Sequence, residues 1–307
     1  MADLSTTVGS LELRSPVVAA SGTFGYGVEY DGLVDWALVG AISVKGLSRH
    51  PSQGNDAPRM VETAAGMLNA IGLQNIGVEA FAADKLPALR TIREQGPRVV
   101  VNCWGDVPED YEAVVTALDG LDGIDAIELN LACPNKAQWD CIPSADPAMT
   151  ADIVGRARAR TGLPLWVKLT PNVTDVTVVA RAAVDAGADA LSLVNTLRGM
   201  AVDVEARRPV LGNTSGGLSG PAIKPVGLFM VHETCRTVEV PVVGGGGAVS
   251  GRDVVEYLMT GARAVQVGTA SLYDPAAPSR IAREVSDVLD ELDEASVQAV
   301  IGSLRTD

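Results

Sequence analysis

The sequence predicts an α/β protein built as a (β/α)8 barrel, also called a TIM barrel. Short apolar runs of β-prone residues recur eight times, and most of them are followed by an amphipathic helical pattern. Runs that are apolar on both faces and alternate with helices indicate a parallel sheet covered by helices. A (β/α)8 barrel typically needs about 250 residues, and the chain has 307. A doubly wound sheet is the competing architecture, but eight units without a G-x-G-x-x-G opening favour the barrel.

The elements follow in order along the chain. The predicted strands are Val17–Ala20, Ala41–Val44, Val99–Val101, Ala126–Leu129, Leu165–Val167, Ala190–Val194, Val242–Val243 and Ala264–Val267. The predicted helices are Ile76–Gln95, Pro108–Leu118, Pro147–Arg160, Val173–Ala186, Ile223–Arg236, Gly251–Met259 and Ala276–Leu292.

The remaining length is assigned to three additions to the barrel. A short N-terminal hairpin is expected from Ser5–Val8 and Leu11–Leu13. Two insertions, Leu47–Asn75 and Gly199–Ser219, are expected to cover the C-terminal rim. Because no low-complexity linker interrupts the pattern, we expect one domain over residues 1–307.

Composition excludes several classes of protein. The net charge is −14 and no Lys/Arg cluster stands out, which argues against nucleic-acid binding. No apolar run reaches the length of a membrane span, and the N-terminus has no secretory signal. The cysteines are scattered without a C-x-x-C pair, so we expect reduced thiols and a cytoplasmic protein with neither a disulfide framework nor a metal cluster. These cysteines are Cys103, Cys133, Cys141 and Cys235.

A single thiol occupies a position suited to chemistry. Cys133 follows the strand Ala126–Leu129 and is flanked by Asn130 and Asn135. In a parallel barrel the C-terminal strand ends carry the active site, so Cys133 is placed like a reactive group. The alternative is a buried cysteine that only packs.

The other strand ends extend this polar rim. Gly244–Gly247 and Val267–Thr269 lie after the seventh and eighth strands, where barrels commonly bind phosphate. Lys45 and Lys168 each follow a strand directly, within reach of a bound ligand. If that ligand were a flavin, a fixed positive charge beside its ring would stabilise the anionic reduced form. The alternative is that both lysines are merely solvated. Because no carboxylates or histidines converge on the rim, we expect no metal.

Several segments resemble the FMN-dependent dihydroorotate dehydrogenases of class 1, across nearly the whole chain. The amino-acid sequence of these segments is most similar to that of class 1B, the NAD-linked branch. The matching segments are Ala20–Gly25, Val44–Gly46, Gly66–Asn75, Leu129–Asn135, Val167–Leu169, Val194–Thr196, Gly216–Pro225 and Val267–Thr269.

This resemblance implies roles for the rim residues. Cys133 would remove the C5 proton of dihydroorotate while a hydride passes from C6 to flavin N5, and Lys45 would lie beside flavin and substrate. The substrate would be held by Lys45, Asn69, Ala70, Ile71, Gly72, Leu73, Asn130, Asn135, Asn195 and Thr196. FMN would be held by Ser21, Lys45, Gly46, Asn102, Asn130, Lys168, Val194, Gly220, Gly246, Gly247, Gly268 and Thr269.

The electron acceptor lies outside the chain. The sequence carries no cysteine cluster for iron–sulfur and no dinucleotide fingerprint for NAD. Electrons therefore leave to a small oxidant or to a second protein. The resemblance implies a partner subunit carrying FAD and a [2Fe–2S] cluster, and we expect a homodimeric core.

Two loops, 48–56 and 136–144, depart from the family pattern. Ser52 stands where the family often has Arg, and Lys136 is followed by Ala, Gln and Trp139 instead of a glycine pair. A Cys133–Cys141 redox pair is an open alternative. Other functions also stay open: an FMN oxidoreductase acting on another dihydropyrimidine-like ring, a non-catalytic flavin scaffold, and an aldolase with Lys168 as Schiff-base lysine.

Overall fold

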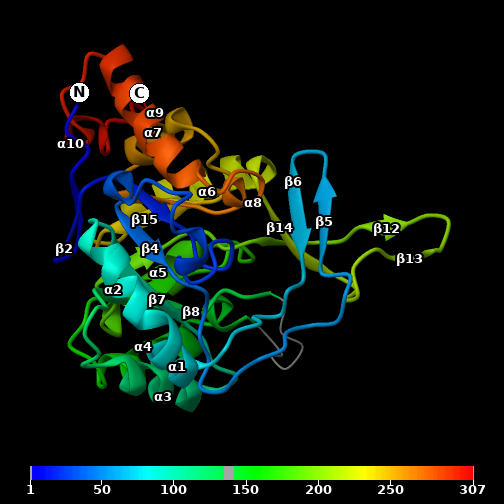
Figure 1. The fold of residues 1–307 in the computed structure, drawn as a ribbon. Coiled ribbons are helices and arrows are strands. Elements are labelled where there is room, and N and C mark those ends of the chain that lie inside the picture. Colours follow the sequence, from blue (N-terminus) through cyan, green and yellow to red (C-terminus); the bar gives the residue numbers. More distant parts are fainter. Residues whose placement is uncertain (1, 135–141, 307) are drawn as a thin grey trace.

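The computed structural model describes residues 2–134 and 142–306. Its centre is a closed barrel of eight parallel strands in chain order, which confirms the predicted fold (Figure 1). The barrel strands are β3 (Val17–Ala19), β4 (Ala41–Ser43), β7 (Arg98–Cys103), β8 (Ala126–Asn130), β9 (Leu165–Lys168), β10 (Ala190–Ser192), β15 (Val242–Gly245) and β16 (Ala264–Val267).

Helices surround the barrel as predicted. The main ones are α2 (Leu86–Glu94), α3 (Pro108–Leu118), α4 (Pro147–Arg158), α5 (Val176–Asp185), α6 (Lys224–Cys235), α7 (Gly251–Met259) and α9 (Ala277–Glu291). Shorter helical segments are α8 (Ala270–Tyr273), α10 (Val297–Val300), η1 (Val28–Tyr30), η2 (Trp36–Leu38), η4 (Pro143–Ala145) and η5 (Pro221–Ile223).

Two predicted helices differ from the structure by more than two residues at one end. The predicted helix Ile76–Gln95 is divided into α1 (Val78–Ala80), a π-helical turn η3 (Phe81–Lys85) and α2. The helix predicted from Val173 begins at Val176, because the Asp175 side chain accepts a hydrogen bond from Thr177 N at 2.9 Å and caps the first turn.

The barrel interior has a closed, apolar lower layer. Each of the eight strands contributes one buried inward residue to it. The hairpin β1 (Thr6–Val8) and β2 (Leu11–Leu13), also as predicted, packs Val8, Leu11 and Leu13 against this layer from below. The inward residues are Val18, Ala41, Val100, Ala126, Trp166, Ala190, Val243 and Ala264. Water is thereby excluded from the bottom of the barrel, and the other end is left for a site.

The two insertions meet each other at that other end. β5 (Met60–Thr63) and β6 (Gly66–Asn69) come from the first, and β11 (Leu197–Gly199) and β14 (Gly216–Ser219) from the second. β6 and β14 pair antiparallel, so that Asn69 lies opposite Gly217 in a four-stranded sheet. The sequence predicts both insertions but not this pairing, which creates a shared wall over the rim.

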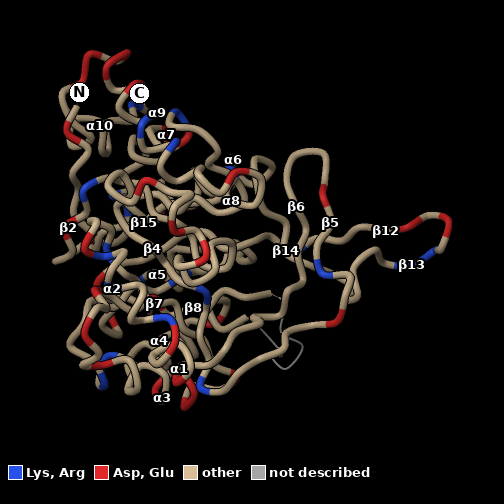
Figure 2. The backbone as a smooth tube through the Cα atoms, viewed as in Figure 1, with Lys and Arg blue, Asp and Glu red and all other residues tan. Residues whose placement is uncertain are grey.

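Other features of the surface are visible from the chain trace. The hairpin β12 (Val202–Asp203) and β13 (Arg208–Pro209) extends away from the body beside this sheet (Figure 1). Figure 2 shows Lys and Arg dispersed among Asp and Glu along the chain. Within the described ranges, no helix is long and apolar enough to cross a membrane.

Candidate active site

A cavity of about 320 Å³ opens at the C-terminal ends of the barrel strands. Nearly all the predicted site residues line it. These are Ser21, Lys45, Gly46, Asn69, Ile71, Gly72, Leu73, Asn102, Asn130, Cys133, Lys168, Val194, Asn195, Thr196, Gly220, Gly246, Gly247, Gly268 and Thr269. Ala70 instead packs in a small cluster with Leu68 and Leu211. Asn135 lies outside the described residues, as does Cys141.

The floor of the cavity is a polar layer with a carboxylate in its middle. Glu128 is fully buried, and its oxygens accept four hydrogen bonds. The donors are Ser43 Oγ at 3.0 Å, Asn102 Nδ2 at 2.6 Å, Ser192 Oγ at 2.8 Å and Gln266 Nε2 at 2.6 Å. Gln266 Oε1 in turn accepts from Lys168 Nζ at 2.5 Å. The sequence pattern does not predict a role for Glu128 or Gln266, although a charged residue inside an otherwise apolar strand, as Glu128 is, indicates one.

The electrostatics of this floor keep Glu128 ionised. Burial raises the pKa of the Glu128 carboxyl. The Lys168 charge and the hydrogen bonds from Ser192, Asn102 and Gln266 outweigh burial and hold that pKa below the ordinary value of 4.5. The floor therefore carries a carboxylate and an ammonium group joined by one carboxamide.

Cys133 and Lys45 lie on the cavity wall above this floor. Cys133 is partly buried, whereas Cys103 is fully buried in the core. Lys45 Nζ donates a hydrogen bond to Gly22 O at 3.3 Å. Burial lowers the pKa of the Lys45 ammonium; Cys133 opposes this shift, and Arg59 adds to it. The Cys133 thiol is thus close enough to affect the ionisation of Lys45.

The first insertion is anchored to the barrel through Asn75. Its Oδ1 accepts from Ser48 N at 3.2 Å and Gly77 N at 2.8 Å, and its Nδ2 donates to Ser48 Oγ at 2.8 Å. Ser52, in the atypical loop 48–56, pairs with Asn75 through two backbone hydrogen bonds of 2.9 Å. Ser52 thus forms part of the backbone anchor of the wall.

Glycines shape the opposite end of the cavity. Gly246 and Gly247 have φ of 109° and 80°, a region that L side chains rarely adopt. A Cβ at position 247 would lie 2.7 Å from Gly220 O. Thr269 Oγ1 donates to Ser219 Oγ at 2.8 Å and so joins this end to β14. The backbone is therefore left accessible to an anion.

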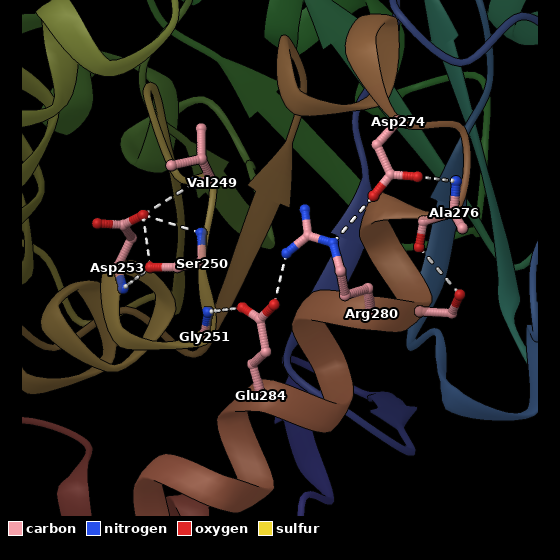
Figure 3. Close-up of polar contacts among 9 residues, drawn as sticks. Val249, Ser250, Gly251, Asp253, Asp274, Ala276, Arg280 and Glu284 are labelled. Atoms are coloured by element: carbon pink, nitrogen blue, oxygen red, sulfur yellow. Dashed lines mark hydrogen bonds and ion pairs between the residues drawn. The ribbon is translucent and has the colours of Figure 1, made fainter.

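An ion-pair network clamps the two loops that form this end (Figure 3). Asp253 accepts from Val249 N and Ser250 N, both at 2.9 Å, and caps α7. Glu284 on α9 accepts from Gly251 N at 2.8 Å and from Arg280 at 2.5 Å. Arg280 also donates to Asp274, in the segment after β16, at 2.9 Å. Side chains of α9 therefore connect the loop after β15 to the segment after β16.

The cavity fits FMN in two independent respects. Its glycine-lined end suits a phosphate group, as the sequence predicts from the loops after the seventh and eighth strands. At the floor, Asn102 Oδ1 is buried and has no hydrogen-bond partner within the described part of the chain, so it can accept from a ligand. Over residues 2–134 and 142–306, no group of His, Cys, Asp and Glu could hold a metal ion.

Comparison with known proteins assigns the family. The family model described as dihydroorotate dehydrogenase matches residues 3–289. The chain is 51% identical over 303 residues to the "dihydroorotate dehydrogenase B (NAD(+)), catalytic subunit" of Geobacter sp. (strain M21), covering 99% of this chain and 98% of that protein. Proteins of the same name from Citrifermentans bemidjiense and Geotalea uraniireducens are each 50% identical, over 99% of this chain and 98% and 99% of theirs. The chain therefore belongs to the dihydroorotate dehydrogenase family, whose cofactor is FMN.

Proposed function

We propose that this chain is the catalytic subunit of a class 1B dihydroorotate dehydrogenase, which oxidises (S)-dihydroorotate to orotate in pyrimidine biosynthesis. The observation that carries the proposal is the placement of Cys133, Lys45 and a ring of carboxamides around one cavity whose far end is lined by glycine. The names of relatives about half identical to this chain support it.

Cys133 is the general base in this proposal. Its thiolate takes the C5 proton of dihydroorotate, and the electron pair of that C–H bond becomes the C5=C6 double bond as a hydride leaves C6. FMN supplies a two-electron acceptor for that hydride when it is bound. Lys45 lies on the same wall and offers a positive charge to the thiolate and to the charge that accumulates during the reaction.

The carboxamides orient the substrate. Asn69, Asn130, Asn195 and Thr196 line the cavity and offer donors and acceptors to a pyrimidine ring and its carboxylate. Backbone groups of residues 70–73 and the side chain of Asn135 complete the proposed substrate set. Thr196 N donates to Asn195 Oδ1 at 2.8 Å, which fixes the direction of that carboxamide.

Lys168 and the glycines hold the cofactor. Lys168 and Asn102 form part of the cavity floor, and Ser21, Gly46, Val194 and Gly220 also line the cavity. Gly246, Gly247, Gly268 and Thr269 bind the phosphate. FMN would thus be held by residues of the floor and, at its phosphate, by the glycine-lined end of the cavity.

The electrons leave the chain through a partner in this proposal. The names of the relatives describe a catalytic subunit and NAD(+). We infer that this chain forms a homodimeric core with an electron-transfer subunit that carries FAD and a [2Fe–2S] cluster.

The test is to add dihydroorotate to the purified yellow protein without oxygen and to follow the visible absorbance of oxidised flavin. Rapid bleaching is the expected result. If the protein keeps its colour with dihydroorotate but is bleached by another dihydropyrimidine, that dihydropyrimidine and not dihydroorotate is the substrate. Failure of the apoprotein to bind added FMN would overturn the flavoenzyme proposal.

A further inference from the structure

Glu128 lies two residues along its strand from the apolar lower layer of the barrel. Inward-facing residues repeat every second position of a strand. Two residues beyond the apolar lower layer, the strands place Ser43, Asn102, Glu128, Lys168, Ser192 and Gln266. Asn102, Lys168 and Gln266 line the cavity, whereas Glu128 does not. Glu128 therefore contacts the residues that form the cavity floor without facing the cavity itself.

An ionised carboxylate can only accept hydrogen bonds. Asn102 must consequently point its Nδ2 at Glu128, at 2.6 Å, and its Oδ1 elsewhere. That Oδ1 is buried, and a Cβ on Gly46 would lie 2.6 Å from it, so it is directed toward the loop after β4 on the cavity rim. The same constraint acts on Gln266, whose Nε2 donates to Glu128 and whose Oε1 accepts from Lys168.

We propose that Glu128 is a positioning residue for the cofactor site, because its carboxylate orients the Asn102 carboxamide and, through Gln266, the Lys168 ammonium toward the cavity. Ser43 and Ser192 donate to the remaining lone pairs of the carboxylate, so rotation of the carboxylate would break hydrogen bonds. This inference rests on the proposed function in one respect, namely that FMN is the ligand of the cavity.

The proposal differs from a purely structural role for Glu128. If Glu128 only filled the barrel, a neutral side chain of the same shape would preserve the site. Under the proposal, Glu128→Gln introduces an NH2 group, and at least one of the two carboxamides must turn over or lose its partner. A turned Asn102 would present a donor to the cavity in place of an acceptor.

The test measures FMN binding to the apoprotein by quenching of flavin fluorescence, together with the reduction potential of bound FMN. Glu128→Gln is expected to raise the dissociation constant of FMN about tenfold and to raise the reduction potential, because a buried negative charge is lost. In a double-mutant cycle, Glu128→Gln and Asn102→Ala are expected to weaken binding by clearly less than the product of their separate effects.

Asp125→Asn is the matched control. Asp125 directly precedes β8 and its side chain is 6% exposed, but it pairs with Arg93 at 2.7 Å outside the cavity. This variant is expected to lose stability and to keep the FMN affinity and potential of the wild type. If Glu128→Gln does not fold, Gln266→Met interrupts the same relay and is expected to weaken FMN binding about threefold or more.

Two results would separate failure of this inference from failure of the proposed function. Wild-type apoprotein that does not bind FMN overturns the proposed function and, with it, this inference. Wild-type protein that binds FMN while Glu128→Gln matches it in affinity and potential overturns the positioning role alone. Fully multiplicative effects in the cycle also overturn it.

Discussion

Two successive layers inside the barrel use the same eight strands in opposite ways. The lower layer is apolar, buried and sealed by the N-terminal hairpin. The upper layer, two residues further along, contains the hydrogen-bonded carboxylate of Glu128 and the ammonium of Lys168. The step between them is a single strand repeat. Position along a strand therefore decides whether an inward side chain supports the fold or serves the site.

The upper layer also shows how a buried charge is compensated. A buried charge is tolerated only where hydrogen bonds and an opposite charge compensate its loss of water. Glu128 satisfies this condition with four donors and the nearby Lys168. Because the lower layer excludes water from beneath, these bonds are made in a medium where they are strong.

The largest effect is expected at the rim, where the reaction would take place. Cys133→Ser is expected to slow the reduction of FMN by dihydroorotate about 10²- to 10⁴-fold, because a hydroxyl is a far weaker base than a thiolate. Stability should change little, since Cys133 lines the cavity and contributes nothing to the lower layer. Anaerobic stopped-flow absorbance measures the rate.

Cys235→Ser is the control for this substitution. Cys235 ends α6 and does not line the cavity. Its variant should reduce FMN at the wild-type rate. Near-wild-type turnover by Cys133→Ser would show that the thiol is not the base.

Truncation of a side chain in the lower layer should reduce stability and leave the FMN site of the folded protein intact. Trp166 is fully buried beside Ala126 and Ala190. Trp166→Ala is expected to lower the free energy of unfolding by about 3–5 kcal/mol, with FMN affinity of the folded fraction unchanged. Trp166→Phe should cost much less, because Trp166 Nε1 makes no hydrogen bond within the described residues. Urea unfolding followed by circular dichroism measures both; equal losses would contradict the packing argument.

The sequence predicts the lower layer more completely than the site. Eight apolar runs suffice to predict the barrel, because its strands are buried on both faces and their pattern is local. The pairing of Asn69 with Gly217 brings together segments 148 residues apart, and no local pattern announces it. Glu128 was visible in its strand, but its role depends on partners from four other strands. The rim residues could be predicted because their motifs resemble those of a known family. Hydrophobic periodicity alone does not say which residues have a functional role.

A pH titration sharpens the contrast between the layers. The folded-state pKa of Glu128 lies below its ordinary value of 4.5. Its contribution to stability is therefore present above pH 4.5 and is lost as the pH falls through the folded pKa. The difference in unfolding free energy between wild type and Glu128→Gln should shrink from pH 7 to pH 3. The deficit of Trp166→Ala should stay constant, and a constant Glu128→Gln deficit would contradict the assignment of Glu128 as ionised.

The smallest effect on stability and FMN binding is expected from the Arg280 ion pairs, which lie outside both layers. Arg280 joins Asp274 in the segment after β16 to Glu284, which accepts from Gly251 N at the start of α7. Its side chain is 41% exposed, so Arg280→Ala should lower stability by no more than about 1 kcal/mol. Because Arg280 links the two glycine-bearing loops, FMN affinity should still fall about twofold to fivefold.

The Arg252–Glu291 pair provides the comparison for this last prediction. It is a similar ion pair of 2.7 Å, with both side chains over 60% exposed, but it joins α7 to α9 without contacting the segment after β16. Arg252→Ala should leave FMN affinity unchanged in the same fluorescence titration. Equal FMN affinities for the two variants would mean that the glycine-bearing loops hold their shape through their own backbone, and that the clamp contributes only to the helical shell.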